Sequence, residues 1–161
     1  MKHLPLLCAR LAAPLALAQA TPPATNGAAS TTVTDDRPAC LVPTPRADEG
    51  GKARQSEVLR RVREAKAPVP VVFVGDSITE GWEGAGQSAW ARDYAPLGAL
   101  QIGVGGDRTE HVLWRLDNGN VAGITPQVAV VMIGTNNSRT NTPEQIAAGI
   151  RAIVAKLREK L

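Results

Sequence analysis

The 161-residue sequence is short of aromatic side chains, with three Trp, one Tyr and one Phe. A core of ordinary size must therefore be built mainly from Val, Ile, Leu and Ala. The length suits one domain with a real core and is too short for two. After the first twenty residues, no stretch is long and apolar enough to cross a membrane, so no membrane-spanning helix is expected there.

Cysteine and net charge are also low. Cys8 lies in a leader-like segment, and Leu7 before it does not fit a lipoprotein cleavage site, so Cys40 would remain as a lone thiol unable to form an internal disulfide. The formal charge is +3, but removing Lys2 and Arg10 with the leader leaves the basic residues only one ahead of the 15 acidic residues. No basic cluster is interleaved with aromatic residues, so nucleic acid is not an expected partner.

The first fifty residues are predicted to be a leader and a linker. Residues 1–20 begin with Lys2, continue through a Leu/Ala-rich stretch and end in Ala18-Gln19-Ala20, the A-x-A pattern of a signal-peptide cleavage site. Arg10 and Pro14 interrupt the apolar part, and the alternative is a disordered cytosolic extension. Residues 21–50 are rich in Thr, Pro and Ala and have no hydrophobic period, which is typical of a disordered linker. We therefore expect a secreted or periplasmic protein whose domain covers residues 51–161.

Short apolar runs alternate with helical patterns through this domain. The runs are Val71–Val74, 99–106 and 128–137, and helices are predicted near 52–66, 79–94 and 109–117. A last helix begins at Thr142-Pro143-Glu144-Gln145, which offers an N-cap, a proline at the first position and a capping box. The order β-α-β-α-β-α predicts a doubly wound parallel sheet covered by helices, with strands buried on both faces.

All three apolar runs end in small or polar residues, namely Gly75-Asp76-Ser77, Gly103-Val104-Gly105-Gly106-Asp107 and Gly134-Thr135-Asn136-Asn137. The carboxyl ends of parallel strands share one edge of the sheet, where ligands bind in such folds. A serine at the start of a helix exposes its hydroxyl, a glycine lets a backbone N–H approach closely, and an Asn amide donates to the same oxygen. The pattern predicts acyl transfer with an oxyanion hole.

The stretches "GDSITEGW", "GVGGDRTEHVLWRL" and "GTNN" resemble the first three sequence blocks of the SGNH (GDSL-type) serine esterases. Within this family, the sequence is most similar to the branch of the platelet-activating-factor acetylhydrolase catalytic subunits, over roughly residues 55–161. The resemblance implies a flavodoxin-like three-layer α/β/α sandwich, ester or O-acetyl substrates, and no metal or cofactor. It also implies that Ser77 is the nucleophile, that Gly106 gives an oxyanion N–H, and that Asn136 gives its side-chain amide.

Simpler interpretations apply to several of these residues. Ser77 is also a possible N-cap, and Asp76 is expected to fix the turn by binding backbone rather than to act as a base. The glycines at 103–106 do not form a dinucleotide loop, because Arg108 stands where the last glycine is needed. Thr79 stands in place of the second glycine of a G-x-S-x-G elbow. The tryptophans are expected to be packing residues, with Trp82 a candidate for the pocket rim.

The proton acceptor that a serine nucleophile needs is missing from the sequence. The family places it in a late D-x-x-H block, but the two histidines here are His3, in the leader, and His111, four residues after Asp107. A packing or helix-surface role is the favoured interpretation of His111. We therefore expect a C-terminally truncated hydrolase domain, with Val128–Ile133 left as an unprotected apolar edge.

The sequence predicts a serine esterase for small acyl or O-acetyl esters, nearly inactive as this chain. The partners expected are a small ester, with an acetylated carbohydrate as one option, and a second copy of the chain as a candidate source of the missing base. The rival hypothesis is a non-catalytic module that uses the same fold to bind a carbohydrate or a protein.

Overall fold

The computed structural model describes residues 35–65 and 68–161, so the predicted leader and most of the predicted linker lie outside the described residues. Its secondary structure alternates strands and helices. The strands are β1 (Val71–Gly75), β2 (Leu100–Gln101) and β3 (Val128–Met132). The α-helices of at least four residues are α1 (Glu49–Glu64), α2 (Ser77–Glu80), α4 (Thr109–Asp117) and α5 (Pro143–Lys160). A short α3 (Gln87–Ala89) lies between α2 and β2.

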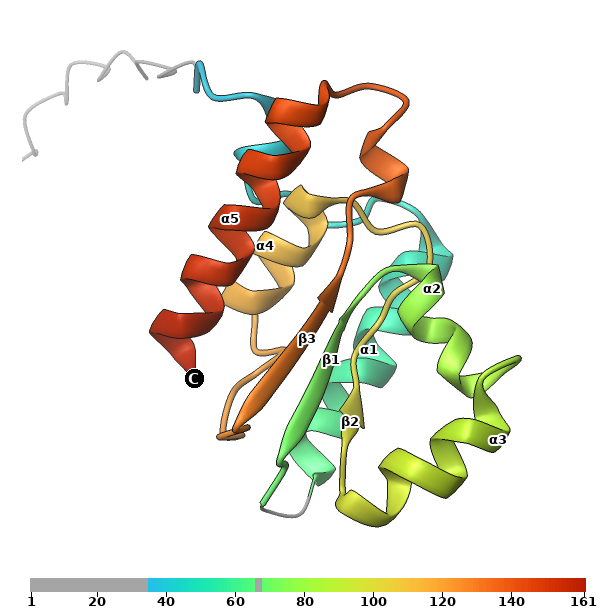
Figure 1. The fold of residues 1–161 in the computed structure, drawn as a ribbon. Coiled ribbons are helices and arrows are strands. Elements are labelled where there is room, and N and C mark those ends of the chain that lie inside the picture. The colour runs from blue at the N-terminus through green and yellow to red at the C-terminus, as the bar shows by residue number, and fades with distance from the viewer. Residues whose placement is uncertain (1–34, 66–67) are drawn as a thin grey trace, which may run out of the picture. The chain divides into compact units, whose positions relative to one another are not determined.

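The three strands form one parallel sheet in the order β2-β1-β3, with β1 in the centre (Figure 1). Val71 pairs with Val128 and Gly75 with Met132 in the β1–β3 register, so these two strands run side by side over their full length. Parallel strands require crossover connections, which here carry the helical segments between them. The predicted doubly wound parallel sheet is confirmed.

Helical segments cover both faces of β1, which makes three layers. Val72 and Val74 on one face are fully buried in the core. That core also contains residues of α1, α4 and α5, including Val58, Val112 and Ile153. Phe73 on the other face belongs to an aromatic cluster. The apolar composition predicted for the core is confirmed, because Val, Ile and Leu supply all fourteen of its cluster members.

The aromatic cluster consists of Phe73, Trp82, Trp90 and Tyr94. Each of its six ring pairs has centroids between 5.0 and 5.9 Å apart. Three of the four rings come from the segment between α2 and β2, so this cluster attaches that segment to the sheet. The predicted packing roles of Trp82 and Trp90 are confirmed.

The helix predicted over 79–94 is wrong as one continuous element. The chain there forms α2, a 3₁₀ turn (Gly81–Glu83), α3, a π-helical turn (Trp90–Tyr94) and a further 3₁₀ turn (Ala95–Leu97). Gly81, Gly84 and Gly86 weaken helix propagation. Gly86 also lies against the Trp82 ring, where a Cβ would approach Cε3 to 2.7 Å.

The second predicted strand is shorter than expected, because only Leu100 and Gln101 form strand pairs with β1. Hydrogen bonds to β1 nevertheless continue past it, from Ile102 N to Phe73 O (2.9 Å) and from Val104 N to Gly75 O (3.1 Å). The glycines that follow leave the ladder and turn toward the sheet edge.

The prediction of strands buried on both faces is correct for β1 and wrong for β3. Val128, Val130 and Met132 are 52, 40 and 47% exposed. β3 is one of the two outer strands of the sheet in the described residues, and it carries no charge, proline or bulge that would protect an edge. The expected unprotected apolar edge is therefore present.

Residues 39–48 differ from the disordered linker predicted for 21–50. Cys40 is fully buried, and its carbonyl accepts a 2.9 Å hydrogen bond from Thr109 Oγ1 of α4. Asp48 caps α1 by accepting a hydrogen bond from Gly51 N (2.8 Å). This segment packs through single residues rather than through a repeating face. It therefore has no hydrophobic period from which its ordered structure could be predicted.

Ion pairs join α1 to the turn after α2. Glu83 accepts hydrogen bonds from Arg54 (2.6 Å) and from Arg61. Burial raises the pKa of Glu83, but the hydrogen bonds from Arg61 and Arg54 outweigh this effect and hold its pKa at about 2.

The last helix begins with the predicted capping box. At α5, Thr142 Oγ1 accepts from Gln145 N (3.3 Å) and Gln145 Oε1 accepts from Thr142 N (3.1 Å), so the capping box is confirmed.

Within residues 35–65 and 68–161, no helix combines the length and apolar character that a membrane crossing requires.

Candidate active site

The first strand tip presents Ser77 at the start of α2. Gly75 ends β1 where a Cβ would overlap the Met132 carbonyl and Thr79 Oγ1, so only glycine fits this close approach. Asp76 is buried, and its Oδ1 accepts a 3.0 Å hydrogen bond from Ile78 N. Asp76 thus fixes the turn, as predicted, while Ser77 is exposed at the sheet edge.

The second strand tip presents the backbone of Gly106. Its φ of +77° is a left-handed conformation that favours glycine. The preceding residue is held at both of its backbone polar groups, because Gly105 N donates to Glu80 Oε2 (2.6 Å) and Gly105 O accepts from Arg46 Nη1 (2.6 Å). The Gly106 N–H donates to no other group within residues 35–65 and 68–161, which leaves it available to a ligand.

The third strand tip separates the roles of the two asparagines. Asn137 is fully buried and ties the loop to α4, accepting from Thr109 N (2.9 Å) and donating to Glu110 Oε2 (3.0 Å). Asn136 is only partly buried, and its Nδ2 donates to Asp107 O (2.8 Å). The first asparagine of the pair is therefore the one that faces the other strand tips.

These contacts bring the three predicted site residues together. Asn136 Nδ2 lies 2.8 Å from the carbonyl of the residue after Gly106 and 3.5 Å from Oδ2 of Asp76, the residue before Ser77. A Cβ placed on Gly105 would lie 3.9 Å from the Ser77 Cβ. A hydroxyl, a backbone N–H and a carboxamide thus occupy one corner of the sheet edge, although they come from positions up to 59 residues apart.

A buried ion pair beneath the tips holds two of them in place. Arg115 is 1% exposed, and its guanidinium donates to Asp107 Oδ2 (2.7 Å), Ile102 O (3.0 Å) and Gly75 O (3.3 Å). Burial raises the pKa of Asp107 against the opposing attraction of Arg115. Arg115 keeps its charge, because a guanidinium is not deprotonated in proteins.

His111 is committed to capping α4. Its Nδ1 accepts a 3.0 Å hydrogen bond from Arg108 N, and burial lowers its pKa, so the ring is favoured in the neutral form. Asp107 Oδ1 lies 3.9 Å from the same nitrogen, which is already an acceptor and cannot donate to that carboxylate. His111 and Asp107 therefore do not form the histidine–carboxylate pair of a serine hydrolase.

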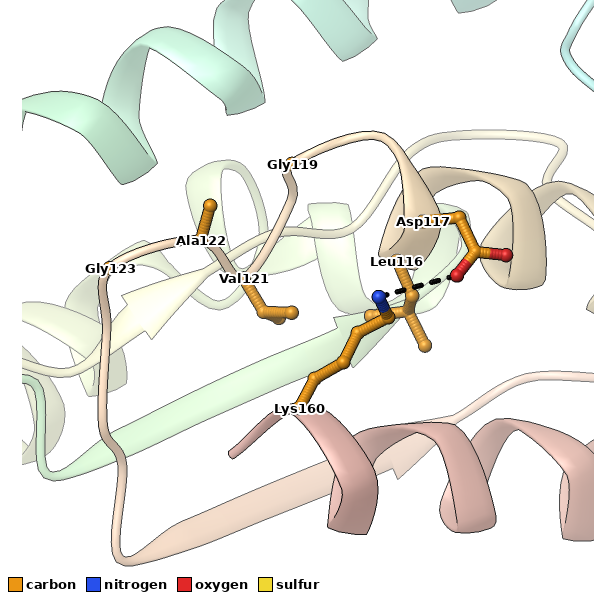
Figure 2. Close-up of a pocket in the computed structure, with 7 residues that line it drawn as sticks. All are labelled: Leu116, Asp117, Gly119, Val121, Ala122, Gly123 and Lys160. Atoms are coloured by element: carbon orange, nitrogen blue, oxygen red, sulfur yellow. Dashed lines mark ion pairs between the residues drawn. The ribbon is translucent and has the colours of Figure 1, made fainter.

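Two hollows flank the strand tips. One, of about 420 Å³, contains Gly106 and Asn136. The other, of about 250 Å³, is apolar and contains Ile78, Trp82 and Met132, so Trp82 does line a hollow beside the nucleophile candidate. The pocket in Figure 2 lies elsewhere, between the end of α4, the loop before β3 and the end of α5, where Lys160 pairs with Asp117 (3.3 Å). Its position at the opposite end of the strands separates it from the three tips.

Sequence reasoning missed Arg46, Glu80 and Arg115. Arg46 fell in the predicted linker, where nothing in the sequence indicates a contact with residue 105. Glu80 belongs to "GDSITEGW" but has no distinctive spacing. The position of Arg115 could have been predicted from the sequence, because it lies on the same side of its helix as Val112 and Leu116. An unpaired charge on this buried side would be costly, which indicates a buried ion pair.

Comparison with known proteins identifies the family. A sequence model of the GDSL-like lipase/acylhydrolase family matches residues 73–161. The platelet-activating factor acetylhydrolase IB subunit beta homolog of Drosophila melanogaster is 40% identical over 124 residues, covering 76% of this chain and 54% of that protein. Subunit alpha1 of Bos taurus is 42% identical over 128 residues, covering 78% and 53%.

A solved structure supports the fold. A Streptococcus pneumonia protein described as a candidate platelet activating factor matches with a TM-score of 0.53 at 18% identity, over 68% of this chain and 49% of that one. The chain spans about half the length of the curated relatives it matches. Its sheet, its strand tips and the matched region agree, and the chain belongs to the GDSL-like lipase/acylhydrolase family of ester hydrolases.

Proposed function

We propose that Ser77 is the nucleophile of a serine esterase that cleaves small acyl or O-acetyl esters through an acyl-enzyme. The Gly106 N–H, the Asn136 amide and the Ser77 N–H are the proposed oxyanion donors. The observation that carries the proposal is the juxtaposition of these groups at one corner of the sheet edge. The names of the relatives, which are acetylhydrolase subunits, favour an acetyl ester as substrate.

The proposed reaction has two steps. Ser77 Oγ forms a bond to the ester carbonyl carbon, its proton passes to a base, and the carbonyl oxygen becomes an anion facing the three donors. The bond to the alcohol oxygen then breaks, and that oxygen takes the proton from the base. In the second step, water attacks the acyl-serine and releases the acid, which restores the Ser77 hydroxyl.

Both steps need a base that the described residues do not supply, since the Nδ1 of His111 is occupied by the α4 cap. We therefore expect the 161-residue chain to hydrolyse p-nitrophenyl acetate at a rate indistinguishable from that of Ser77→Ala. Adding imidazole to the buffer supplies a base, and we expect hydrolysis by the unmodified chain then to exceed that by Ser77→Ala. Equal rates in imidazole would overturn the assignment of Ser77, and fast Ser77-dependent turnover without it would refute the expected inactivity.

Two alternatives are separated by the same assay. If a second copy of the chain provides the base, specific activity should rise with protein concentration. If the protein is a carbohydrate- or protein-binding module, the chain should stay monodisperse and no serine should become acylated in imidazole. Mass spectrometry of the acetylated chain distinguishes these cases, because slow deacylation should leave the acetyl group on Ser77.

We also propose that the protein is exported. The support is the A-x-A pattern that ends at Ala20 in the sequence. Expression of the full chain in a bacterial host, followed by N-terminal sequencing of the periplasmic fraction, should give Thr21 as the first residue. An intact Met1 on protein confined to the cytoplasm would contradict this.

A further inference from the structure

A cationic pocket adjoins the proposed oxyanion donors. Its volume is about 420 Å³, and it is lined by Gly106, Arg108, Thr135, Asn136, Ser138 and Arg139. Two of the six lining residues are arginines and none is acidic. The pocket shares Gly106 and Asn136 with the proposed oxyanion hole, so a group bound in it would lie next to the carbonyl of an ester held there.

The two arginines have few protein partners. Arg139 is exposed and forms no ion pair within residues 35–65 and 68–161. In the same described residues, the one ion pair of Arg108 is with Glu110, and its Nη1 lies 3.8 Å from Oε1, which is longer than a hydrogen bond. Glu110 is already used by Asn137, which donates to Oε2. The guanidinium donors that face this pocket therefore remain open to an anion.

A third guanidinium, that of Arg46, lies beneath the pocket and is paired with Asp48 and Asp107. Its Nη1 would lie 3.0 Å from a Cβ placed on Gly106, so the guanidinium is in close contact with that glycine. Its Nε donates to Asp48, and its Nη1 donates to Gly105 O and Asp107 Oδ1. Arg46 is thus held by two carboxylates beneath the pocket, and the arginines that line the pocket are Arg108 and Arg139.

We infer that this pocket binds a carboxylate or phosphate carried by the ester that Ser77 cleaves, so that the preferred substrate is an acidic ester. The inference rests on the proposed function. A planar guanidinium matches either oxyanion through paired N–H donors, which makes arginine well suited to this recognition. A neutral ester would gain nothing from either arginine, whereas an acidic one is attracted to the site and oriented there.

A binding experiment tests the pocket without requiring turnover. Benzoate and phenyl phosphate are titrated into the 161-residue chain by isothermal calorimetry, with benzamide as the neutral analogue. We expect at least one anion to bind, benzamide not to bind, and the double variant Arg108→Gln/Arg139→Gln to weaken anion affinity about tenfold. Arg151→Gln, which removes an exposed arginine of α5 outside the pocket, is the matched control and should bind as the unmodified chain does.

The two titrations also identify the anion, because tighter binding of benzoate indicates a carboxylate and tighter binding of phenyl phosphate indicates a phosphate. Failure of both anions to bind overturns the inference, as does equal weakening in the control variant. Circular dichroism of each variant verifies that it is folded. The single variants Arg108→Gln and Arg139→Gln replace the double variant if that protein does not fold.

A turnover experiment separates this inference from the proposed function. With imidazole present, 4-acetoxybenzoate and its neutral methyl ester are compared, and we expect the preference for the acidic ester to fall in Arg108→Gln/Arg139→Gln. The variant-to-parent ratio cancels the different intrinsic reactivities of the two esters. If Ser77→Ala changes neither rate, the proposed function fails while the calorimetry still decides the pocket. If hydrolysis depends on Ser77 but the preference does not depend on the arginines, the pocket inference alone fails.

Discussion

Replacing Arg115 by Met should destabilise the domain severely. The substitution preserves most of the buried volume but removes the charge partner of Asp107, which has no exposed surface. Gly75 O also accepts from Val104 N and keeps that partner, whereas Ile102 O and Asn120 Oδ1 lose the Arg115 donor along with the Asp107 carboxylate. Removing one member of a buried ion pair costs about 3–5 kcal/mol in free energy of unfolding. Because Arg46 still lies 3.3 Å from Asp107, we expect the lower end, about 3 kcal/mol.

The pH dependence of this loss distinguishes an uncompensated charge from a cavity. Without Arg115, the pKa of Asp107 should rise further above its usual value of 3.8. A carboxyl with a raised folded pKa stabilises the fold fully below its unfolded pKa and loses that contribution as the pH rises through the folded value. The deficit of the variant relative to the parent should therefore shrink as the pH is lowered from about 7 to about 4.

The assay is urea unfolding followed by far-ultraviolet circular dichroism at both pH values. The control is the double variant Asp107→Asn/Arg115→Met, which leaves no unpaired charge and should recover part of the stability at neutral pH. A deficit below about 1 kcal/mol for the single variant, or one that does not change with pH, would refute the assignment of Arg115 as the essential partner of Asp107.

Three further substitutions test other parts of the structure. Gly75→Ala should cost about 3 kcal/mol by overpacking β1 against β3, whereas Gly81→Ala, with nothing within 4 Å, should be nearly neutral in the same unfolding assay. Glu83→Gln should lower stability at neutral pH. The pKa of Glu83 in the folded protein is about 2, below its usual 4.5. The higher stability of the parent protein over Glu83→Gln should therefore disappear as the pH falls from about 4.5 toward 2. Val130→Lys places a charge on β3 and should reduce self-association measured by sedimentation velocity. The control Ala155→Lys, on the exposed side of α5, should not reduce it. Equal self-association of the two variants would rule out β3 as the contact.

The sequence was sufficient to predict the sheet and its strand tips. Continuous apolar runs that end on glycine are visible without any structure, and the capping box at Thr142 is a local pattern between neighbouring residues. The choice of Asn136 over Asn137 came from the family resemblance. The structure adds the physical difference, which is that Asn137 is buried against α4 and hydrogen-bonded to it, while Asn136 faces the strand tips.

The unpredicted features depend on contacts between distant positions. Arg46 holds Gly105 across 59 residues, and no periodic pattern marks such a contact. The broken helix after Ser77 arises because three glycines and the packing of Trp82 override a pattern that otherwise favours one helix. Tertiary packing determines both features, and local propensity is not sufficient to predict either of them.

The clustering of Phe73, Trp82, Trp90 and Tyr94 has a spectroscopic consequence. Two of the three tryptophans lie in this cluster, on the segment that follows the proposed nucleophile, while Trp114 lies on α4. Because Trp82 also lines the hollow beside Ile78, an acyl chain entering there should change the emission of the cluster while leaving that of Trp114 nearly constant. A protein carrying Trp114→Phe would therefore report occupancy next to Ser77 by its intrinsic fluorescence, without any attached dye.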